Sequence, residues 1–218
     1  MGKTFERIIK ELWQGLVEVV YPRENYCIIC KDDNCFGICD SCKKSIKTIN
    51  NSYQDEIISY GYYGGVLKDL ILKFKYKNNF TAGDILAEFL EEYITKNLKY
   101  KEYVITYIPL SKKSRKVRTF NQCEYIAKKI GRDLSIEVLE VLIKQKETKE
   151  QKTLRRDERY ENIKDAFKIK KRIKLKNYNI ILIDDVVTTG ATLHEAYELL
   201  KKSDIKDIKL LTLAKSHI

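Results

Sequence analysis

The sequence predicts an α/β protein in which helices cover a parallel sheet, with a small cysteine-rich module before it. The apolar run Ile180 to Ile183 has no polar alternation, which indicates a strand buried on both faces. Helical apolar patterns alternate with further strand-like runs between residues 57 and 213. A length of 218 residues and a hydrophobic content of 44% are sufficient for a real core, so the chain is globular.

The first predicted element is an amphipathic helix over Thr4–Tyr21, because its apolar residues recur at helical spacing until Pro22. This helix either packs on its own domain or offers Trp13 to a partner. Charged residues interrupt its apolar positions, so it is no signal peptide. No apolar run approaches the ~20 residues that span a bilayer. We therefore expect a cytoplasmic protein without membrane insertion.

Two Cys-x-x-Cys pairs follow, Cys27 with Cys30 and Cys39 with Cys42. Four thiolates at this spacing suit a closed, structural zinc site; unconnected free thiols are the alternative. Cys35 has the wrong spacing for a second pair and is interpreted as a bystander. We expect residues 1–50 to hold the helix and a zinc finger resembling a double zinc ribbon, and residues 51–218 to form the larger domain. The metal would supply the folding energy of so small a module.

The larger domain is predicted as a series of strands and helices, bounded by glycine, proline and changes of apolar period. In chain order these are a strand at Ile57–Tyr63, helices at 66–77 and 82–97, a strand at Val104–Ile108 closed by Pro109, a helix at 121–130 stopped by Gly131, a strand at 167–169, a strand at Ile180–Ile183, a helix at Leu193–Lys202 and a strand at Lys209–Leu213 that closes the sheet. Cys123 lies in the third of these helices and is predicted to be a packed thiol.

A basic loop follows the strand that ends at Pro109. It carries no acid and contains Lys112, Lys113, Arg115, Lys116 and Arg118. Such a loop is suited to a pyrophosphate or a nucleic-acid backbone, although a solvated surface loop is the alternative. The net charge of +11 agrees with polyanionic partners, or else reflects lineage bias. A single nucleic-acid strand could extend to Lys152, Arg155 and Arg156 and stack on Phe120, unless that ring belongs to the core.

The most informative stretch comes directly after Ile183. Asp184 and Asp185 are expected where the strand leaves the sheet, at the carboxyl edge where open α/β folds bind ligands. Residues 188–192 then place hydroxyls and backbone N–H groups before a helix N-terminus, which favours a phosphate. The acids require hydroxyls or magnesium beside that phosphate, as in a ribose 5-phosphate. The alternative is a buried strand followed by a helix capped by Thr189 or Thr192.

This block resembles the phosphoribosyl-pyrophosphate (PRPP) motif of type I phosphoribosyltransferases: an apolar strand, two acids, then Thr-Thr-Gly-x-Thr. The resemblance implies a type I phosphoribosyltransferase-like sheet and a magnesium ion bound with PRPP. It also implies that Asp184 and Asp185 meet the ribose hydroxyls and serve catalysis. The remaining PRPP-binding residues that it implies are Val187, Thr188, Thr189, Gly190, Ala191, Thr192, Ser111 and Lys112.

Further motifs resemble the ComF family. After the four-cysteine finger come Arg118-Thr119-Phe120-Asn121-Gln122, Gln151 with Leu154, Arg159 with Asn162, and Ala166-Phe167. Thr119 stands where the family usually has Gly and would be strained at positive φ. The polar stretch Lys146–Arg156 resembles the superfamily's mobile catalytic loop; a disordered linker is the alternative.

The ComF resemblance implies a protein of DNA uptake and natural transformation. Such a protein would bind PRPP with magnesium and single-stranded DNA, with competence machinery proteins as possible partners. An active phosphoribosyltransferase that acts on an unidentified base or amine is the alternative. In that enzyme, magnesium and groups such as Lys112 and Arg115 would stabilise the departing pyrophosphate.

Overall fold

The computed structural model describes residues 25–33, 35–52, 55–111, 114–115, 119–145, 165–171 and 173–216. The predicted helix Thr4–Tyr21 and the polar stretch Lys146–Arg156 lie outside the described residues.

A parallel sheet forms the centre of the described molecule, with the strand order β1-β6-β5-β2. These strands are β1 (Ile57–Tyr62), β6 (Asp207–Lys215), β5 (Asn179–Val187) and β2 (Tyr103–Tyr107). All four confirm predicted strands. The prediction that the last strand closes the sheet is wrong, because β6 lies inside it with β1 and β5 as its neighbours. Leu210 and Leu211 explain this position, since they are buried in the clusters on opposite faces of β6.

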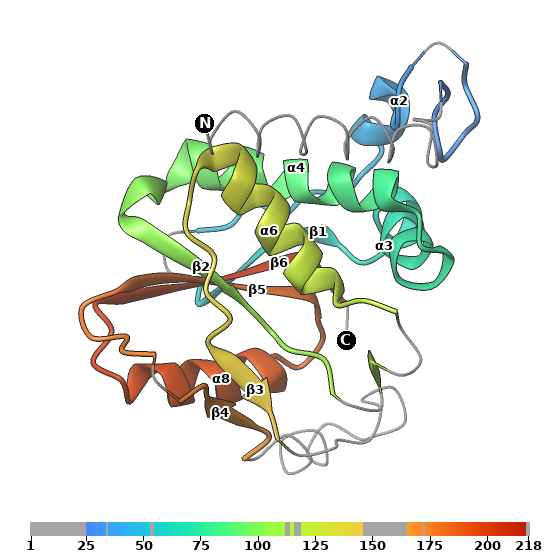
Figure 1. Ribbon diagram of the computed structural model, residues 1–218. Helices are drawn as coiled ribbons and strands as arrows, with labels where there is room; N and C mark the ends of the chain where they lie inside the picture. Colours follow the sequence, from blue (N-terminus) through green and yellow to red (C-terminus); the bar gives the residue numbers. More distant parts are fainter. Residues whose placement is uncertain are drawn as a thin grey trace, which may run out of the picture.

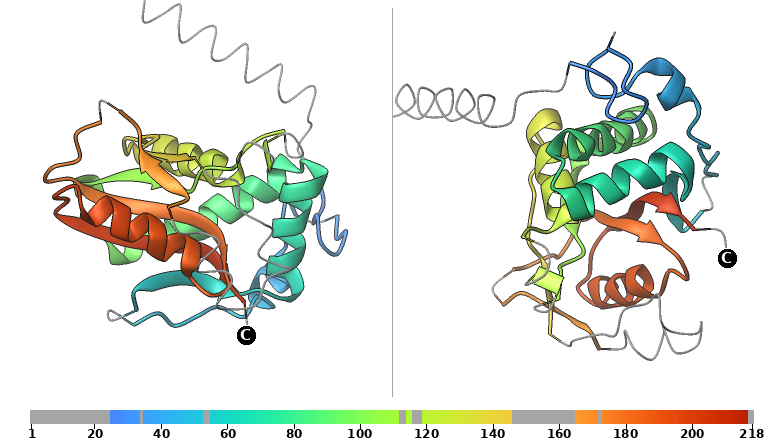
Figure 2. Two further views of the ribbon diagram at one scale, coloured as in Figure 1. Left: turned by 90° about the horizontal axis from the view of Figure 1, so that it is seen from below. Right: turned by 90° about the vertical axis from the view of Figure 1, so that its right-hand side faces the viewer.

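Helices cover both faces of the sheet, as Figures 1 and 2 show. One face carries α3 (Gly65–Lys77), α4 (Phe80–Asn97) and α6 (Gln122–Leu134), and the other carries α8 (Ala191–Lys201). Ile181 and Ile183 of β5 pack in the hydrophobic cluster of the first three helices, and Ile180 and Leu182 pack in that of α8. The uninterrupted apolar run therefore has the predicted cause: both sides of the strand are covered.

Smaller elements surround this core. They are α2 (Asp40–Lys44), the 3-10 helix η1 (Tyr100–Glu102) and the antiparallel strands β3 (Leu142–Lys144) and β4 (Phe167–Ile169). The strand predicted at 167–169 is confirmed, but it pairs only with β3 and stands outside the main sheet. Leu142 and Phe167 of this small sheet, together with the adjoining Val141, join the hydrophobic cluster of α8.

Gly131 does not stop α6, so that prediction is wrong. The helix continues to Leu134 and ends at Ser135, which adopts the left-handed conformation with φ of 55°. Gly131 is instead a site of close packing: a Cβ there would lie 2.3 Å from Val138 Cγ2 and 2.8 Å from the Ile136 carbonyl oxygen. The missing side chain thus lets the segment after α6 turn back against the helix.

Replacing Gly131 with alanine should lower the free energy of unfolding by about 1–3 kcal/mol, the usual cost of overpacking a well-packed site. Gly64→Ala is the matched control, because nothing lies within 4 Å of a Cβ at Gly64. Urea unfolding of both variants measures the difference. A Gly131→Ala protein as stable as Gly64→Ala would contradict the close packing described above.

Candidate functional site

The candidate ligand site lies at the carboxyl edge of the sheet, where β5 extends beyond the end of its neighbour β2. β2 pairs with β5 only as far as Ile183, whereas β6 pairs with it as far as Val187. Asp184 and Asp185 therefore belong to the strand, and the prediction that the strand ends before them is wrong. The physical reason is the length of β6, which carries β5 onward after β2 has stopped. On the β2 side, the acids lie beyond the last paired residue.

The two carboxylates are held by different partners. Asp184 Oδ1 accepts the backbone N–H of Asp185 at 2.8 Å and lies 3.7 Å from Cys123 Sγ. Asp185 Oδ2 lies 2.6 Å from Lys75 Nζ, and both of these side chains are largely buried. Burial and the neighbouring charge of Asp185 raise the pKa of Asp184 to about 7. The pair is thus less negative than two free aspartates.

Cys123 is a buried thiol beside these acids, in agreement with the prediction that it is packed. Burial and the charges of Asp185 and Asp184 raise its pKa well above the ordinary value. The thiol therefore stays protonated and can donate weakly to Asp184. A reactive cysteine needs the opposite environment, so nothing here favours Cys123 as a nucleophile.

The predicted phosphate loop and Asp184 line one pocket. Its lining consists of Asp184, Val186, Val187, Thr188, Gly190, Ala191, Thr192 and Leu193. Gly190 has a φ of 79° and is the N-cap of α8, but it has no side chain with which to cap the helix. The N-cap residue is neither Thr189 nor Thr192, but Thr189 Oγ1 accepts the Ala191 N–H at 3.5 Å, so the capping alternative is wrong only in which residue stands at the cap. The first turn of α8 opens onto this pocket, and a helix N-terminus there favours an anion.

The loop after β2 is described only in part. Ser111 is buried, its hydroxyl accepts the Ser114 N–H at 3.1 Å, and its carbonyl accepts the Arg115 N–H at 2.9 Å. Ser111 therefore closes a tight turn, and Arg115 is exposed on it. The other basic residues of this loop lie outside the described residues: Lys112, Lys113, Lys116 and Arg118.

Four cysteines meet at a second site, away from the sheet. The Sγ atoms of Cys27, Cys30, Cys39 and Cys42 all lie within 4.8 Å of one another. Sulfurs around tetrahedral zinc lie about 3.8 Å apart when each Zn–S bond is about 2.3 Å. The distance between Cys30 Sγ and Cys39 Sγ is 3.6 Å, so the group fits such an ion.

The surroundings of the four cysteines act on their thiols in different directions: burial and neighbouring thiols raise the pKa of Cys42, whereas the pKa of Cys27 is lowered. Burial alone would raise the pKa of Cys27, but backbone N–H groups, including that of Cys39, outweigh it and lower that pKa to about 6. Cys35 stands outside the group, with its Sγ 3.9 Å from the Asp32 carbonyl oxygen. This placement agrees with its interpretation as a bystander.

Comparison with known proteins shows which proteins this chain resembles. Residues 121–218 match the model of the phosphoribosyl transferase domain. Competence protein F of Haemophilus influenzae is 28% identical over 209 residues, which cover 83% of this chain and 91% of that protein. Competence protein ComFC of Streptococcus pneumoniae is 33% identical over 153 residues, which cover 70% of this chain and 65% of that protein. The chain is therefore similar to competence proteins of the ComF family, and its second half to the phosphoribosyl transferase domain. It spans slightly less than two thirds of the pneumococcal ComFC protein.

A solved structure resembles this chain more weakly. It is a hypoxanthine phosphoribosyltransferase of Staphylococcus aureus, 18% identical, with a TM-score of 0.38 and coverage of 61% of this chain and 62% of that one. These values are too low to carry an argument about activity. Among the described residues, no helix has both the length and the apolar character required to cross a bilayer.

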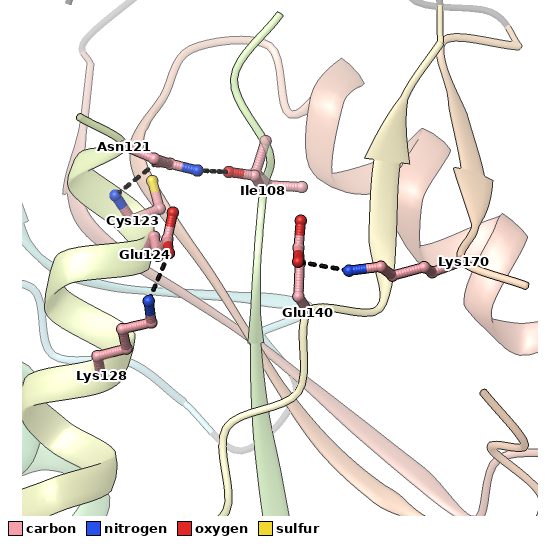
Figure 3. Close-up of polar contacts among 7 residues, drawn as sticks. All are labelled: Ile108, Asn121, Cys123, Glu124, Lys128, Glu140 and Lys170. Atoms are coloured by element: carbon pink, nitrogen blue, oxygen red, sulfur yellow. Dashed lines mark hydrogen bonds and ion pairs between the residues drawn. The ribbon is translucent and has the colours of Figure 1, made fainter. Parts of the chain in front are cut away.

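The ComF motif around Asn121 has a structural role. Figure 3 shows Asn121 between β2 and α6: its Nδ2 donates to the Ile108 carbonyl oxygen at 3.1 Å, and its Oδ1 accepts the Cys123 N–H at 3.0 Å. The Ile108 N–H in turn donates to the Ile183 carbonyl oxygen at 3.0 Å. Asn121 thereby ties the start of α6 to the end of β2, beside the acids.

Its motif neighbours are packed as well. Gln122 is buried, and neither polar atom of its side chain has a hydrogen-bond partner among the described residues. Phe120 lies 5.1 Å, ring to ring, from Phe74 and from Phe80, which favours the core over base stacking. Thr119 does not have a positive φ, so it is not strained in the way expected for a glycine position.

Of the other ComF motif residues, two are buried and the rest lie in the part of the chain that the structure does not describe. Ala166 and Phe167 are buried beneath α8. Gln151, Leu154, Arg159 and Asn162 lie outside the described residues. Figure 3 also shows the ion pair between Lys170 and Glu140, 2.6 Å long, which holds the outer end of the small sheet together.

Sequence reasoning missed one residue of the site. Lys75 reaches Asp185 from α3, although the two residues are far apart in the sequence. In the sequence, Lys75 belongs to a Lys-rich helix end and looks like its neighbour Lys77. The only available sign was its position directly after the core residue Phe74, which does not by itself indicate a ligand site.

Proposed function

We propose that this protein binds PRPP with magnesium at the carboxyl edge of the sheet and handles single-stranded DNA during DNA uptake and natural transformation. The observation that carries the PRPP part is the single pocket that joins Asp184 to the open first turn of α8. Carboxylates accept hydrogen bonds from ribose hydroxyls, and the helix N-terminus binds the 5-phosphate. The competence names of the relatives support the DNA part.

Each proposed PRPP-binding residue has a definite task. Asp184 and Asp185 hold the ribose, while Val187, Thr188, Thr189, Gly190, Ala191 and Thr192 surround the 5-phosphate. Ser111 and Lys112 are assigned to the pyrophosphate side. Magnesium would be held with the pyrophosphate of PRPP and would offset its charge. The finger would hold one structural zinc through Cys27, Cys30, Cys39 and Cys42, in a module of residues 1–50 that precedes the ligand-binding domain of residues 51–218.

Calorimetric titration of the intact, zinc-loaded protein with PRPP tests this proposal. We expect saturable binding in the presence of magnesium and weaker binding without it. Ribose 5-phosphate and inorganic pyrophosphate, titrated separately, report on the two halves of the site. PRPP that fails to bind with magnesium at millimolar concentration would refute the proposed ligand.

A second function is favoured by the matched phosphoribosyl transferase domain: transfer of the phosphoribosyl group to a base or an amine. In that reaction, the bond from the anomeric carbon to pyrophosphate breaks and a bond to the acceptor nitrogen forms. Pyrophosphate release on incubation with candidate bases and amines separates turnover from binding alone. Release that depends on an added acceptor would establish the transferase.

The basic loop at residues 112–118 is the proposed surface for single-stranded DNA, extending to Lys152, Arg155 and Arg156. Five phosphate contacts should make log affinity fall with log salt at a slope of roughly −3 to −4. Replacing Lys112, Lys113, Arg115, Lys116 and Arg118 with glutamine should flatten this slope and weaken binding. Fluorescence anisotropy with a labelled single strand at several salt concentrations measures both quantities.

A matched control for that experiment removes five exposed lysines near the opposite, amino edge of the sheet. They are Lys96, Lys99, Lys101, Lys202 and Lys206. Both variants change the net charge equally, so a general charge effect would act on both. If the two variants lose the same affinity and slope, the loop is not the DNA surface.

A further inference from the structure

The acid pair at the ligand site, Asp184 and Asp185, has a lysine ammonium group beside it. Lys75 Nζ lies 2.6 Å from Asp185 Oδ2, and the side chains of Lys75 and Asp185 are 13% and 18% exposed. An ion pair this well shielded is screened little by salt, and removing one partner leaves a buried charge. Lys75 is therefore fixed at the site rather than one of the solvated lysines of the surface.

Helix α3 carries Lys75, whereas the loops of the site do not contribute it. This residue lies in the last turn of α3, directly after Phe74, whose ring is 1% exposed in the core. Phe74 packs against Phe120 and Tyr125, and Asn78 ends the helix in the left-handed conformation. The backbone that carries Lys75 is thus anchored on one side by the core and on the other by the helix end.

Among the described residues, the other groups in contact with Asp184 add no negative charge. Cys123 Sγ approaches Asp184 at 3.7 Å as a neutral donor, and the Asp185 N–H donates to Asp184. Two carboxylates and one ammonium leave at most a single net negative charge. Magnesium binds through carboxylates in near-ideal octahedral geometry and gives up its water reluctantly. A site in which one carboxylate already contacts an ammonium group is poorly suited to a magnesium ion.

We propose that Lys75 is a positioning residue that neutralises Asp185, so that the acid pair binds the vicinal hydroxyls of a phosphorylated ribose directly and holds no divalent cation of its own. The inference rests on the proposed function and deepens it. Magnesium then enters only with the pyrophosphate of the ligand. A ligand that lacks pyrophosphate but keeps the ribose and its 5-phosphate needs no magnesium to bind.

Manganese titration of the protein without PRPP tests the role of Lys75. We expect weak binding to the wild type and at least tenfold tighter binding to Lys75→Met, because the freed carboxylate of Asp185 can then accept a cation. Adding Asp185→Asn to Lys75→Met should remove the gain. Lys75→Arg should behave like the wild type, and so should Lys77→Met, which removes an exposed lysine from the same helix turn. Equal manganese affinity in wild type and Lys75→Met would overturn the proposal.

A second measurement uses only the wild type, in case Lys75→Met does not fold. Ribose 5-phosphate should bind with the same affinity, within about twofold, in magnesium-free buffer and with magnesium added. The buffer must contain no chelator, so that the finger keeps its metal. Ribose 5-phosphate that binds only with magnesium would overturn the inference. Failure of PRPP to bind would instead refute the proposed function, so the two failures are distinguishable.

Discussion

Replacing Cys27 with serine should abolish the proposed zinc binding and unfold the finger, with damage that reaches the main core. Cys27 and the adjacent Ile28 are 0% exposed, and Ile28 belongs to the same hydrophobic cluster as α3, α4 and α6. Exposing one buried isoleucine costs about 1.5–3 kcal/mol. We therefore expect Cys27→Ser to lose about one equivalent of zinc, on the four-thiolate expectation. Its free energy of unfolding should fall by at least that cost.

Elemental analysis and urea unfolding measure the two effects. Cys35→Ser is the matched control, because Cys35 lies in the same module but outside the four-sulfur group. It should keep both the zinc and the stability of the wild type. If Cys35→Ser loses the metal while Cys39→Ser retains it, the ligand assignment is wrong.

The finger is not an independent appendage. Ile28 is buried with the main core, and a Cβ at Gly37, which has a φ of 75°, would lie 3.3 Å from Ile85 Cδ1 of α4. Lys43 of α2 also pairs with Glu92 of α4 at 2.6 Å. Cysteine spacing predicts the four-cysteine group, because its members are local in the sequence. It cannot predict this docking, which depends on residues some fifty positions apart.

The same distinction between local and distant contacts explains the sheet. An apolar run such as Ile180 to Ile183 is local and predicts a strand buried on both faces. The extension of β5 through Asp184 and Asp185 depends on the length of β6, which is distant in sequence. Gly131 is a further case: local propensity treats glycine as a helix stop, but close packing against Val138 decides its position.

The ligand site follows the same rule. The acids and the Thr-rich loop are contiguous, so their motif is readable in the sequence. Lys75 and Cys123 reach the acids from two other helices and carry no motif of their own. A lysine is common in this chain, which holds 42 basic residues, so only the fold distinguishes Lys75 from the rest.

Replacing both Asp184 and Asp185 with asparagine should lower the affinity for PRPP with magnesium by more than about a hundredfold. A hydrogen bond to a charged group contributes about 1.5–3 kcal/mol, and two ribose hydroxyls would each lose one such partner. Asparagine preserves the shape of the side chains, so the fold should survive, but its melting temperature should fall because the Lys75 ammonium loses the carboxylate that pairs with it. Calorimetry gives the affinity, and thermal unfolding in the absence of ligand checks the fold.

The control for that double variant must match its change in net charge. Asp69→Asn with Asp204→Asn does so, because both of these residues are exposed and neither lines the pocket. PRPP carries several negative charges, so a variant with fewer acids should attract it slightly better through long-range electrostatics alone. The control should therefore bind PRPP as well as the wild type or marginally better, and only the acid-pair variant should lose it. Unchanged PRPP affinity in Asp184→Asn with Asp185→Asn would remove the ribose-binding role assigned to these acids.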